Sequence, residues 1–536
     1  MASLNQAISL DWVSKSTSHW SKNIWFPEAF DRSKLTKRTV TALSEYESPY
    51  VLAVDIGSSS VKAGLFDSHA RSVSGIETTV PHTQTVASDG TSEEDADLIR
   101  SATEEAIDSV LSKSGSLTAE IAGVGFDSMA STVLGVDTND EPVTPVYTYA
   151  DTRSAYDVDR LRNELNVPVV YDRTGVMQHT SYLPGRIRWL RRTQPDIADK
   201  IDKYVDISTY IFSKWFGRSD VKTSYCVSSW SGLLNRHEMN WDQGLLGRLG
   251  IGEENLPELA SWSDPERALA PEFAQRWPAL AELPFLLAVG DGAAVNVGTG
   301  CVDETKVALT VGTTGAMRVL SEGPAPEVPN GLWAYRLGET RTLLGGSFSE
   351  GGNVVQWALD NLKLPPIEQL NSELEKLKPA QHGINVLPFI AGERATGWST
   401  SATGVLEGIR ISTTPIEILQ AMLESVAYRF ALVADLLLPG VKSGYQMIAS
   451  GGAITNSPWW LQVMADVLGV PVGVSAEQQD TSRGTAILAL NALGVWRGLN
   501  DHPAHIAETY TPNTGNSAIY ADARSNQTEL YSRLLD

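Results

Sequence analysis

Residues 51–67 read VLAVDIGSSSVKAGLFD, an apolar run, a short glycine and serine stretch, and a second apolar run. Two apolar runs separated by turn residues are typical of a β-hairpin. Glycine lets the main chain approach an anion closely, and neighbouring N–H and hydroxyl groups can surround it. We therefore predict two strands joined by a phosphate-binding turn, whose polar residues are Asp55, Gly57, Ser58, Ser59, Ser60 and Lys62.

The same order of residues recurs in the second half of the chain, where residues 307–320 read VALTVGTTGAMRVL. When Gly57 is aligned with Gly312, Ser58 and Ser59 fall over Thr313 and Thr314, whereas Asp55 falls over Thr310. Two hydroxyl-tipped hairpins can face one polyphosphate from opposite sides, and a single carboxylate predicts one metal-organising site between them. The repeat therefore indicates a duplicated chain that holds a nucleotide between two lobes.

Length and charge narrow the class of protein. A chain of 536 residues is too long for one core and predicts two large domains, and no uninterrupted apolar run is long enough to cross a bilayer. The formal charge of −22 would repel nucleic acid and anionic lipid over most of the surface. We therefore expect neither nucleic acid nor a membrane as a partner.

The cysteines and the first 46 residues bear on where in the cell the protein works. The two cysteines, Cys226 and Cys301, form no CxxC pair, which favours reduced packing residues and a cytoplasmic location. The first 46 residues carry scattered tryptophans and no signal-peptide pattern. We expect them to form an extension whose aromatic side chains pack on the main body, with a targeting peptide or a partner-binding arm as the alternatives.

Two segments have the spacing of a helix start. Thr91-Ser92-Glu93-Glu94 and Thr414-Pro415-Ile416-Glu417 both match the capping box, and the second adds proline at the first helical position. After Thr414, apolar residues recur at helical spacing, so we predict a long core helix without a cofactor role. The apolar positions are Ile416, Leu419, Leu423, Val426, Phe430 and Val433.

An ordered set of short motifs carries more information than any one of them. The chain contains neither the P-loop of ATPases nor a complete dinucleotide fingerprint. It contains, in order, the segments 55–62 (DIGSSSVK), 123–129 (GVGFDSM), 149–153 (YADTR), 290–293 (GDGA), 312–315 (GTTG), 392–394 (GER) and 451–456 (GGAITN). This set resembles the FGGY family of carbohydrate kinases, and the resemblance covers almost everything from Val51 to about Gly498.

The resemblance implies an α/β fold with two duplicated actin-like, ribonuclease-H-like domains and a nucleotide and sugar cleft between them. We expect an N-terminal extension (1–46), a sugar-binding domain (47–300), an ATP-binding domain (301–498) and a C-terminal tail (499–536). ATP and Mg²⁺ are the implied cofactors. We expect the two domains to close on a sugar or polyol, and we leave a homodimer open.

The family motifs also imply roles for single residues. Asp291 matches the catalytic base, and Asp55 and Asp291 match the residues that organise Mg²⁺. The implied nucleotide contacts are the first turn already named, together with Gly312, Thr313, Thr314, Gly352, Gln356, Gly451, Gly452 and Asn456. The implied sugar contacts are Ser128, Met129, Asp151, Arg153, His179, Asp291 and Gly292.

The chemistry of phosphoryl transfer accounts for this set of residues. Charge spreads over the phosphoryl oxygens in the transition state, so the reaction needs a metal, N–H donors and a group that accepts the alcohol proton. Asp291 would be that acceptor. Taken alone, an aspartate between two glycines is typical of a turn. Only the ordered set of motifs favours a catalytic role for Asp291.

The sequence leaves the acceptor open. Residues 171–190 and 387–395 resemble gluconate kinases of the family, whereas the Gly-Phe-Asp-Ser of 125–128 resembles kinases of ribulose and related ketoses. Gluconate is an anion, and cationic residues cluster in sequence near the expected sugar loops. They are Arg153, Arg173, His179, Arg186 and Arg188.

We therefore favour a gluconate-like acceptor, with a ribulose, xylulose or erythritol-type kinase as the alternative. Two hypotheses from other classes are an actin- or chaperone-like ATPase and a non-catalytic sugar sensor. An ATPase needs no sugar clamp such as Asp151 and Arg153, and a sensor needs no base and metal ligand together. The presence of both sets favours the kinase.

Overall fold

The computed structural model describes residues 46–477, 479–501 and 503–535. Its first large sheet follows the order β14-β15-β6-β1-β2-β3, with β16 also paired to β6. The hairpin predicted at residues 51–67 is present, because β1 and β2 pair antiparallel with Val51 opposite Phe66. The strands are β1 (Tyr50–Ile56), β2 (Ser60–Phe66), β3 (Ser72–Pro81), β6 (Ile121–Ser128), β14 (Pro265–Glu266), β15 (Phe285–Leu286) and β16 (Val289–Gly290).

The second large sheet follows the order β19-β20-β18-β17-β23-β24-β25. The hairpin predicted at residues 307–320 is its centre, since β17 and β18 pair antiparallel with Val311 opposite Gly315. The strands are β17 (Lys306–Val311), β18 (Gly315–Glu322), β19 (Trp333–Arg336), β20 (Arg341–Phe348), β23 (Gln446–Ser450), β24 (Val472–Ser475) and β25 (Ile506–Tyr510).

The two sheets share one topology, which confirms the predicted duplication. In each, three antiparallel strands (β3-β2-β1 and β20-β18-β17) are followed by strands parallel to the first of the chain (β6 beside β1, β23 beside β17). A further parallel strand then adds at the same edge, β15 with β16 in one sheet and β24 in the other. This is the two-domain arrangement of the actin-like kinases that the sequence predicted.

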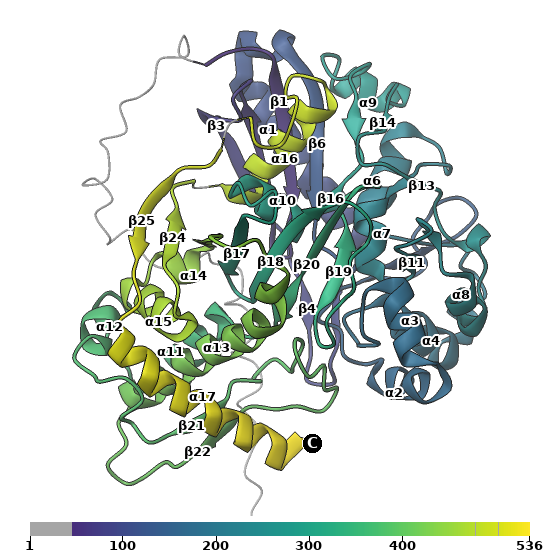
Figure 1. Ribbon diagram of the computed structural model, residues 1–536. Helices are drawn as coiled ribbons and strands as arrows, with labels where there is room; N and C mark the ends of the chain where they lie inside the picture. Colours follow the sequence, from purple (N-terminus) through teal and green to yellow (C-terminus); the bar gives the residue numbers. More distant parts are fainter. Residues whose placement is uncertain (1–45, 478, 502, 536) are drawn as a thin grey trace, which may run out of the picture.

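Two helices in equivalent positions join the halves. The helix α10 (Asp291–Gly298) follows β16, and α16 (Asp480–Ala492) follows β24. Figure 1 shows both helices between the two sheets, and α16 packs on β1 and β6 of the first sheet. A Cβ atom on Gly298 would overlap the carbonyl oxygen of Asp480, and one on Gly484 would overlap the carbonyl oxygen of Ala294. The helices therefore cross with their backbones in direct contact.

One of the two predicted helix starts is correct. Helix α13 (Pro415–Leu437) begins at the predicted capping box, in which the Thr414 N–H and hydroxyl both donate to Glu417. Its apolar stripe lies in the core, and Leu419, Val426 and Phe430 are fully buried.

The other predicted start is wrong. Residues Ser92–Glu94 form strand β5, paired with β8 (Val146–Tyr147), and helix α1 (Ala96–Ser114) begins after Asp95. The Asp95 carboxylate caps α1 by accepting from the Asp97 and Leu98 N–H groups. Because side chains alternate between the two faces of a strand, the Glu94 side chain lies on the same face of β5 as Ser92, and both are buried.

The rest of the first half is an insertion of short helices beside the first sheet. These helices pack around their own apolar cluster, which includes Leu161, Ile187, Leu233 and Leu245. In Figure 1 they form the lower right part of the molecule. They are α2 (Ala155–Glu164), α3 (Val167–Thr174), α4 (Leu183–Thr193) and α8 (Gln243–Leu249), whereas α6 (Ile207–Phe216) and α7 (Tyr225–Ser231) pack in the apolar clusters of the two sheets.

The structure describes the C-terminal end of the chain but only the last residue of the predicted N-terminal extension. The predicted extension lies outside the described residues except for Tyr46, so the packing of its aromatic side chains stays a prediction. At the other end, β25 extends the second sheet and α17 (Thr514–Leu535) packs against α13 and α15 (Pro458–Leu468).

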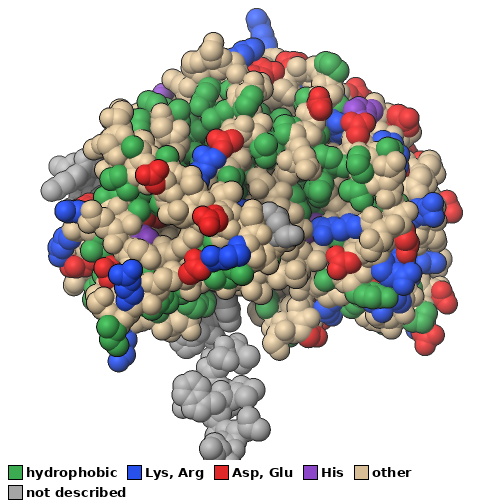
Figure 2. All heavy atoms as spheres, turned by 60° about the horizontal axis from the view of Figure 1, so that its bottom comes forward, with side chains coloured by type: hydrophobic (Ala, Val, Ile, Leu, Met, Phe, Trp, Pro, Cys, Tyr) green, Lys and Arg blue, Asp and Glu red, His purple; other side chains and the backbone are tan. Residues whose placement is uncertain are grey.

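The surface carries charges of both signs. On the face shown in Figure 2, acidic and basic side chains are interspersed among polar and apolar ones. Within the described part of the chain, no helix combines the length and the apolar character needed to cross a membrane.

Candidate active site

The first phosphate turn is held by short contacts at the end of β1. The Gly57 N–H donates to the Ser60 carbonyl over 3.1 Å, which closes the turn, and Ser58 and Ser59 are exposed at its tip. Asp55 is buried at the end of β1, and Lys62 Nζ lies 3.1 Å from its Oδ2 atom. The turn therefore presents main-chain and hydroxyl groups beside a carboxylate that is paired with one cation.

Three carboxylates meet at the ends of neighbouring strands. Asp55 on β1 lies opposite Asp127 on β6, and Asp127 lies opposite Val289 on β16, two residues before Asp291. Asp291 is the first residue of α10, and its Oδ1 accepts from the Gly292 N–H over 2.7 Å. The structure thus brings the two predicted metal and base residues together, although they are far apart in sequence.

Asp127 is a functional candidate that sequence reasoning missed. It is fully buried, its Oδ2 accepts from the Thr485 hydroxyl of α16 over 2.5 Å, and its Oδ1 has no hydrogen-bond partner among the described residues. A carboxylate at the end of an otherwise apolar strand was the available signal, because the carboxyl ends of parallel strands meet at one edge of a sheet.

Burial and repulsion from neighbouring carboxylates raise the pKa of Asp127 and Asp291. The pKa of Asp127 lies well above its usual value because the group is desolvated and because Asp55 and Asp291 are close. Burial also raises the pKa of Asp291, whereas the nearby Arg318 guanidinium opposes the increase. The site is therefore an anionic cluster that a cation would stabilise.

Arg318 is the second residue that sequence reasoning missed. It lies on β18 of the second sheet, and one of its nitrogens donates to the Thr310 hydroxyl over 3.3 Å. Burial lowers its pKa to about 10, while Asp291 acts in the opposite direction. A charged residue within an apolar strand was the signal, since such a group must have a partner or a ligand. Arg318 places a cation from the second half beside the predicted base of the first.

The second phosphate turn is supported by helix α11 (Gly352–Asn361). The Gly352 N–H donates to the Gly312 carbonyl over 2.8 Å, and the Asn353 N–H donates to the Thr313 carbonyl over 3.1 Å. Gly451 has a φ of 92°, and a Cβ atom there would overlap the Val311 carbonyl. Gly312, Thr313, Gly352 and Gly451 therefore lie together, as the motif set implied.

The remaining predicted nucleotide contacts lie on the same half. Gly452 begins α14 (Gly452–Thr455), and its carbonyl accepts from the Asn456 side chain over 2.7 Å. Gln356 lies on α11, and its amide donates to Asp360 over 2.8 Å. Contact of Gly452, Asn456 and Gln356 with a nucleotide stays a prediction.

The predicted sugar-binding residues Asp151 and Arg153 contact each other and other side chains of the protein. Arg153 lies 2.6 Å from Asp151 and 2.9 Å from Glu93, and its guanidinium lies over the Trp189 ring at 4.6 Å. Ser128 ends β6 with a buried hydroxyl, whereas the Met129 side chain belongs to the apolar core. Their contact with a sugar stays a prediction.

Tyr149, in the predicted segment 149–153, lies close to Asp291. Burial raises the pKa of the Tyr149 hydroxyl, Asp291 and Glu94 raise it further, and Arg394 opposes them. The Arg394 guanidinium lies over the Tyr149 ring at 5.5 Å. The GER motif therefore contributes its arginine to the neighbourhood of Asp291.

The cationic residues that lie near one another in sequence, at the expected sugar loops, do not gather into one cationic site. Arg173 pairs with Asp242 at 2.5 Å, Arg188 pairs with Glu164 at 2.6 Å, and the buried Arg186 donates to main-chain carbonyls. Arg173, Arg186 and Arg188 therefore give no support to an anionic acceptor, because neighbours in sequence on short helices point to different partners. Among the described residues, the cations that act on Asp291 are Arg318 and Lys62, and Arg394 lies near Arg318 and Tyr149.

His179, the other member of that cluster, is buried. Burial and nearby arginines lower its pKa to about 3, so the ring is neutral near pH 7. Its Nδ1 accepts from the Ser181 N–H over 3.2 Å, and the ring packs against Trp398. A sugar contact for His179 stays a prediction.

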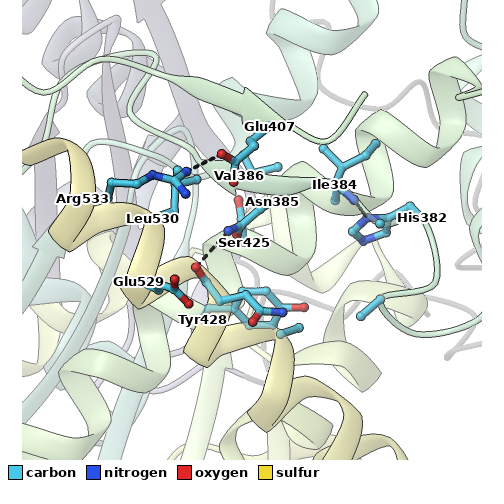
Figure 3. Close-up of a pocket in the computed structure, with 15 residues that line it drawn as sticks. His382, Ile384, Asn385, Val386, Glu407, Ser425, Tyr428, Glu529, Leu530 and Arg533 are labelled. Atoms are coloured by element: carbon cyan, nitrogen blue, oxygen red, sulfur yellow. Dashed lines mark hydrogen bonds and ion pairs between the residues drawn. The ribbon is translucent and has the colours of Figure 1, made fainter. Parts of the chain in front are cut away.

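A pocket of about 340 Å³ lies apart from these residues (Figure 3). It is lined by α13, α17 and strands β21 (Asn385–Leu387) and β22 (Val405–Glu407), and Arg533 pairs with Glu407 at its edge. Among the described residues, no predicted site residue lines it. The pocket is therefore separate from the carboxylate cluster.

Comparison with known proteins identifies the two halves. Residues 50–298 match the model of the N-terminal domain of the FGGY family of carbohydrate kinases, and residues 307–493 match the model of its C-terminal domain. Among curated relatives, a gluconokinase of Bacillus subtilis is 28% identical over 83% of this chain and 88% of the relative. A glycerol kinase of Brucella ovis is 28% identical over 84% and 91%.

Solved structures agree with this match. A gluconate kinase and a xylulose kinase, both from Lactobacillus acidophilus, each superpose with a TM-score of 0.82 at 25% identity, over 90% of this chain and 98% of theirs. A Plasmodium falciparum glycerol kinase with ADP superposes with a TM-score of 0.78 at 20% identity, over 91% and 98%.

Proposed function

The chain belongs to the FGGY family of carbohydrate kinases, a phosphotransferase family whose phosphoryl donor is ATP, and we propose that this enzyme phosphorylates a gluconate-like sugar acid with Asp291 as the general base. The observation that carries the proposal is the meeting of Asp55, Asp127 and Asp291 at the strand ends with Arg318 beside them. The predicted division into a sugar-binding domain (47–300) and an ATP-binding domain (301–498) is part of this proposal.

Asp291 is suited to accept the proton of the acceptor hydroxyl. It is tethered at the start of α10 by the Gly292 N–H, which leaves its second oxygen for the substrate. A base works best when its pKa is near the working pH, and burial moves the pKa of Asp291 in that direction. Arg318 limits the increase and favours the ionised carboxylate, the form that can take the proton as the phosphoryl group transfers.

The carboxylate cluster fits Mg²⁺ held in part by substrate. Asp127 has a buried oxygen without a hydrogen-bond partner among the described residues, and repulsion within the cluster is relieved by added positive charge. No group of three or more His, Cys, Asp or Glu in the described chain has the arrangement of a complete metal cage. Mg²⁺ typically takes one or two carboxylates plus phosphates and water. We propose that Asp55 and Asp291 hold it, where it would neutralise charge on the transferring phosphoryl group.

A sugar acid as acceptor is supported by two cations and by the relatives. Arg318 lies near Asp291, Arg394 lies near Tyr149 and Arg318, and each arginine has a buried Nε without a hydrogen-bond partner among the described residues. Guanidinium groups bind carboxylates well. Two similar proteins are named for gluconate. The buried, unpaired thiols Cys226 and Cys301 support the further proposal that the enzyme works in the cytoplasm.

The first test is a coupled ADP-release screen with MgATP and a panel of gluconate, ribulose, xylulose, erythritol and glycerol. We expect gluconate to give the strongest signal, and Asp291→Ala to reduce it by about 10²- to 10⁴-fold, because the variant lacks the proton acceptor. Asp95→Asn is the matched control, since Asp95 also stands at a helix start but caps α1 away from the carboxylate cluster.

Strong signal with another compound and none with gluconate would contradict the proposed substrate. ATP hydrolysis that no acceptor stimulates would contradict the kinase mechanism itself. A signal that Asp291→Ala leaves unchanged would contradict the role of Asp291.

A further inference from the structure

The first phosphate turn is fixed from behind by His82, the residue that follows β3. The His82 N–H donates to the Ser59 carbonyl over 3.2 Å, and the ring Nε2 lies 2.9 Å from the Gly57 carbonyl. The ring is buried, with 2% of the side chain exposed. Two carbonyl groups of the turn therefore point toward a single residue.

This contact decides where the N–H groups of the turn point. The peptide unit is planar and trans, so a C=O and the following N–H point in opposite directions. With the Gly57 carbonyl directed at His82, the Ser58 N–H is directed away from it, toward the exposed tip of the turn. An N–H group presented in this way is what an anion-binding turn needs.

The ring itself is held by Glu94. Its Nδ1 lies 2.5 Å from Glu94 Oε2, and only 1% of the Glu94 side chain is exposed. Apart from this close contact, neither Nδ1 nor either carboxylate oxygen has a hydrogen-bond partner among the described residues. Because a carbonyl oxygen can only accept, Nε2 donates to Gly57, and the close contact of Nδ1 with the carboxylate fixes the orientation of the ring. Glu94 ends strand β5 and precedes the cap of α1, so it is rigidly placed.

The position of the turn indicates which phosphate it serves. The turn belongs to the same sheet as Asp55, Asp127 and Asp291, and Asp55 lies two residues before Gly57. The phosphoryl group that transfers must approach the acceptor hydroxyl at Asp291. The first turn therefore lies beside the terminal phosphate of ATP, which ADP lacks.

We propose that His82 is a positioning residue that aims the Ser58 N–H at the terminal phosphate of ATP, and that Glu94 orients the His82 ring for this task. The inference rests on the assignment of the first turn to phosphate in the proposed function. It extends that function to two residues outside the turn, and it predicts that ATP depends on the pair more than ADP does.

Two substitutions of His82 distinguish the contact of Nε2 with the Gly57 carbonyl from the contact of Nδ1 with Glu94. The amide nitrogen of glutamine takes the place of Nε2, so His82→Gln keeps the donor to the Gly57 carbonyl. Asparagine reaches only as far as Nδ1, so His82→Asn loses that donor. We expect His82→Asn to weaken ATP binding about 10-fold and ADP binding less than about 3-fold, because a buried carbonyl loses its partner and the turn loses its orientation.

In the same experiment, His82→Gln should bind ATP within about 3-fold of the wild type, and Glu94→Gln should fall between the two. Binding is measured by calorimetry with Mg²⁺ and ATP or ADP, without any acceptor, so the result is independent of the identity of the sugar. A melting temperature for each variant checks that it is folded.

The second half of the chain offers a matched control. His382 Nε2 lies 3.0 Å from Glu424 Oε2, and both side chains are buried. His382 lines the pocket of Figure 3, away from the phosphate turns. Glu424→Gln makes the same change in another buried histidine–glutamate pair, and the ATP to ADP affinity ratio should remain that of the wild type.

Equal ATP affinity in the wild type and His82→Asn would overturn the inference alone. So would an equal loss of ATP and ADP affinity in His82→Asn, or a Glu424→Gln variant with the same selective loss. A wild-type protein that binds no ATP would overturn the proposed function and this inference with it.

Discussion

Glu350 lies directly behind the second phosphate turn. It precedes Gly351 and Gly352, and neither of its carboxylate oxygens has a hydrogen-bond partner among the described residues. Burial raises the pKa of Glu350 to about 7, although the Arg429 guanidinium, 4.0 Å away, acts in the opposite direction. Arg429 forms an ion pair with Glu393 at 2.5 Å, so its charge only partly compensates a charge on Glu350.

Glu350 should make the stability of the protein depend on pH. Its folded-state pKa is raised above the usual value of 4.5, so the folded state binds more protons than the unfolded state between pH 4.5 and 7. The stability contributed by the protonated group is complete below pH 4.5 and is lost as the pH rises through 7. The loss is on the order of 3 kcal/mol for a buried group with this shift.

The test compares urea unfolding of the wild type and Glu350→Gln from pH 5 to pH 8. Glutamine carries no titratable proton, so the variant should gain stability relative to the wild type as the pH rises. Glu368→Gln, an exposed position in the first turn of α12 (Ile367–Leu374), should follow the wild type. Parallel curves for the wild type and Glu350→Gln would contradict the prediction.

At the scale of elements, the crossing of α10 and α16 sets how the two halves meet. Gly298 and Gly484 are the positions at which the backbones touch, because a Cβ atom on either would overlap a main-chain carbonyl of the other helix. The crossing lies directly behind the carboxylate cluster, since α10 begins with Asp291 and α16 carries Thr485, which donates to Asp127.

A side chain at this crossing should destabilise the protein. Gly484→Ala places a methyl group on the Ala294 carbonyl, and the helices must separate to admit it. We expect a loss of about 1–3 kcal/mol in the free energy of unfolding, measured in urea, which is typical of overpacking. Gly247→Ala in α8 is the control, because a Cβ atom there meets nothing within 4 Å and alanine should stabilise that helix by up to about 1 kcal/mol. Equal stability of Gly484→Ala and the wild type would count against a tight crossing.

At the scale of the whole molecule, the proposed function assigns complementary parts of one reaction to the two sheets. The first contributes Asp55, Asp127 and Asp291, and the second contributes Arg318 and the second phosphate turn. Because a transferable phosphoryl group must be shielded from water, the halves are expected to close on ATP and acceptor together. We expect such a movement to turn about the crossing of α10 and α16.

Closure predicts a smaller radius of gyration in solution when both ligands are bound. X-ray scattering with gluconate and a non-hydrolysable ATP analogue should show the change for the wild type and for Asp291→Asn, because the substitution removes the base and keeps the shape of the side chain. Scattering with gluconate alone provides the control. Superimposable curves with and without saturating ligands would contradict closure.

The sequence by itself determined the elements that depend on local order. The two hairpins, the capping box at Thr414 and the core helix α13 follow from short-range patterns of apolar, turn and capping residues. The ordered motifs identified the family and placed Asp55 and Asp291 among its functional residues. These features are visible in sequence because each depends on residues a few positions apart.

Only the tertiary structure decided which side chains share an environment. Asp127 became part of the site because β6 lies between β1 and β16, and Arg318 because β18 faces Asp291 from the other half. Glu94 became a partner of His82 because residues 92–94 form strand β5, in which the Glu94 side chain is buried, and not the first turn of a helix. Burial, pairing and repulsion between charges arise from contacts distant in sequence, so no local pattern of residues specifies them.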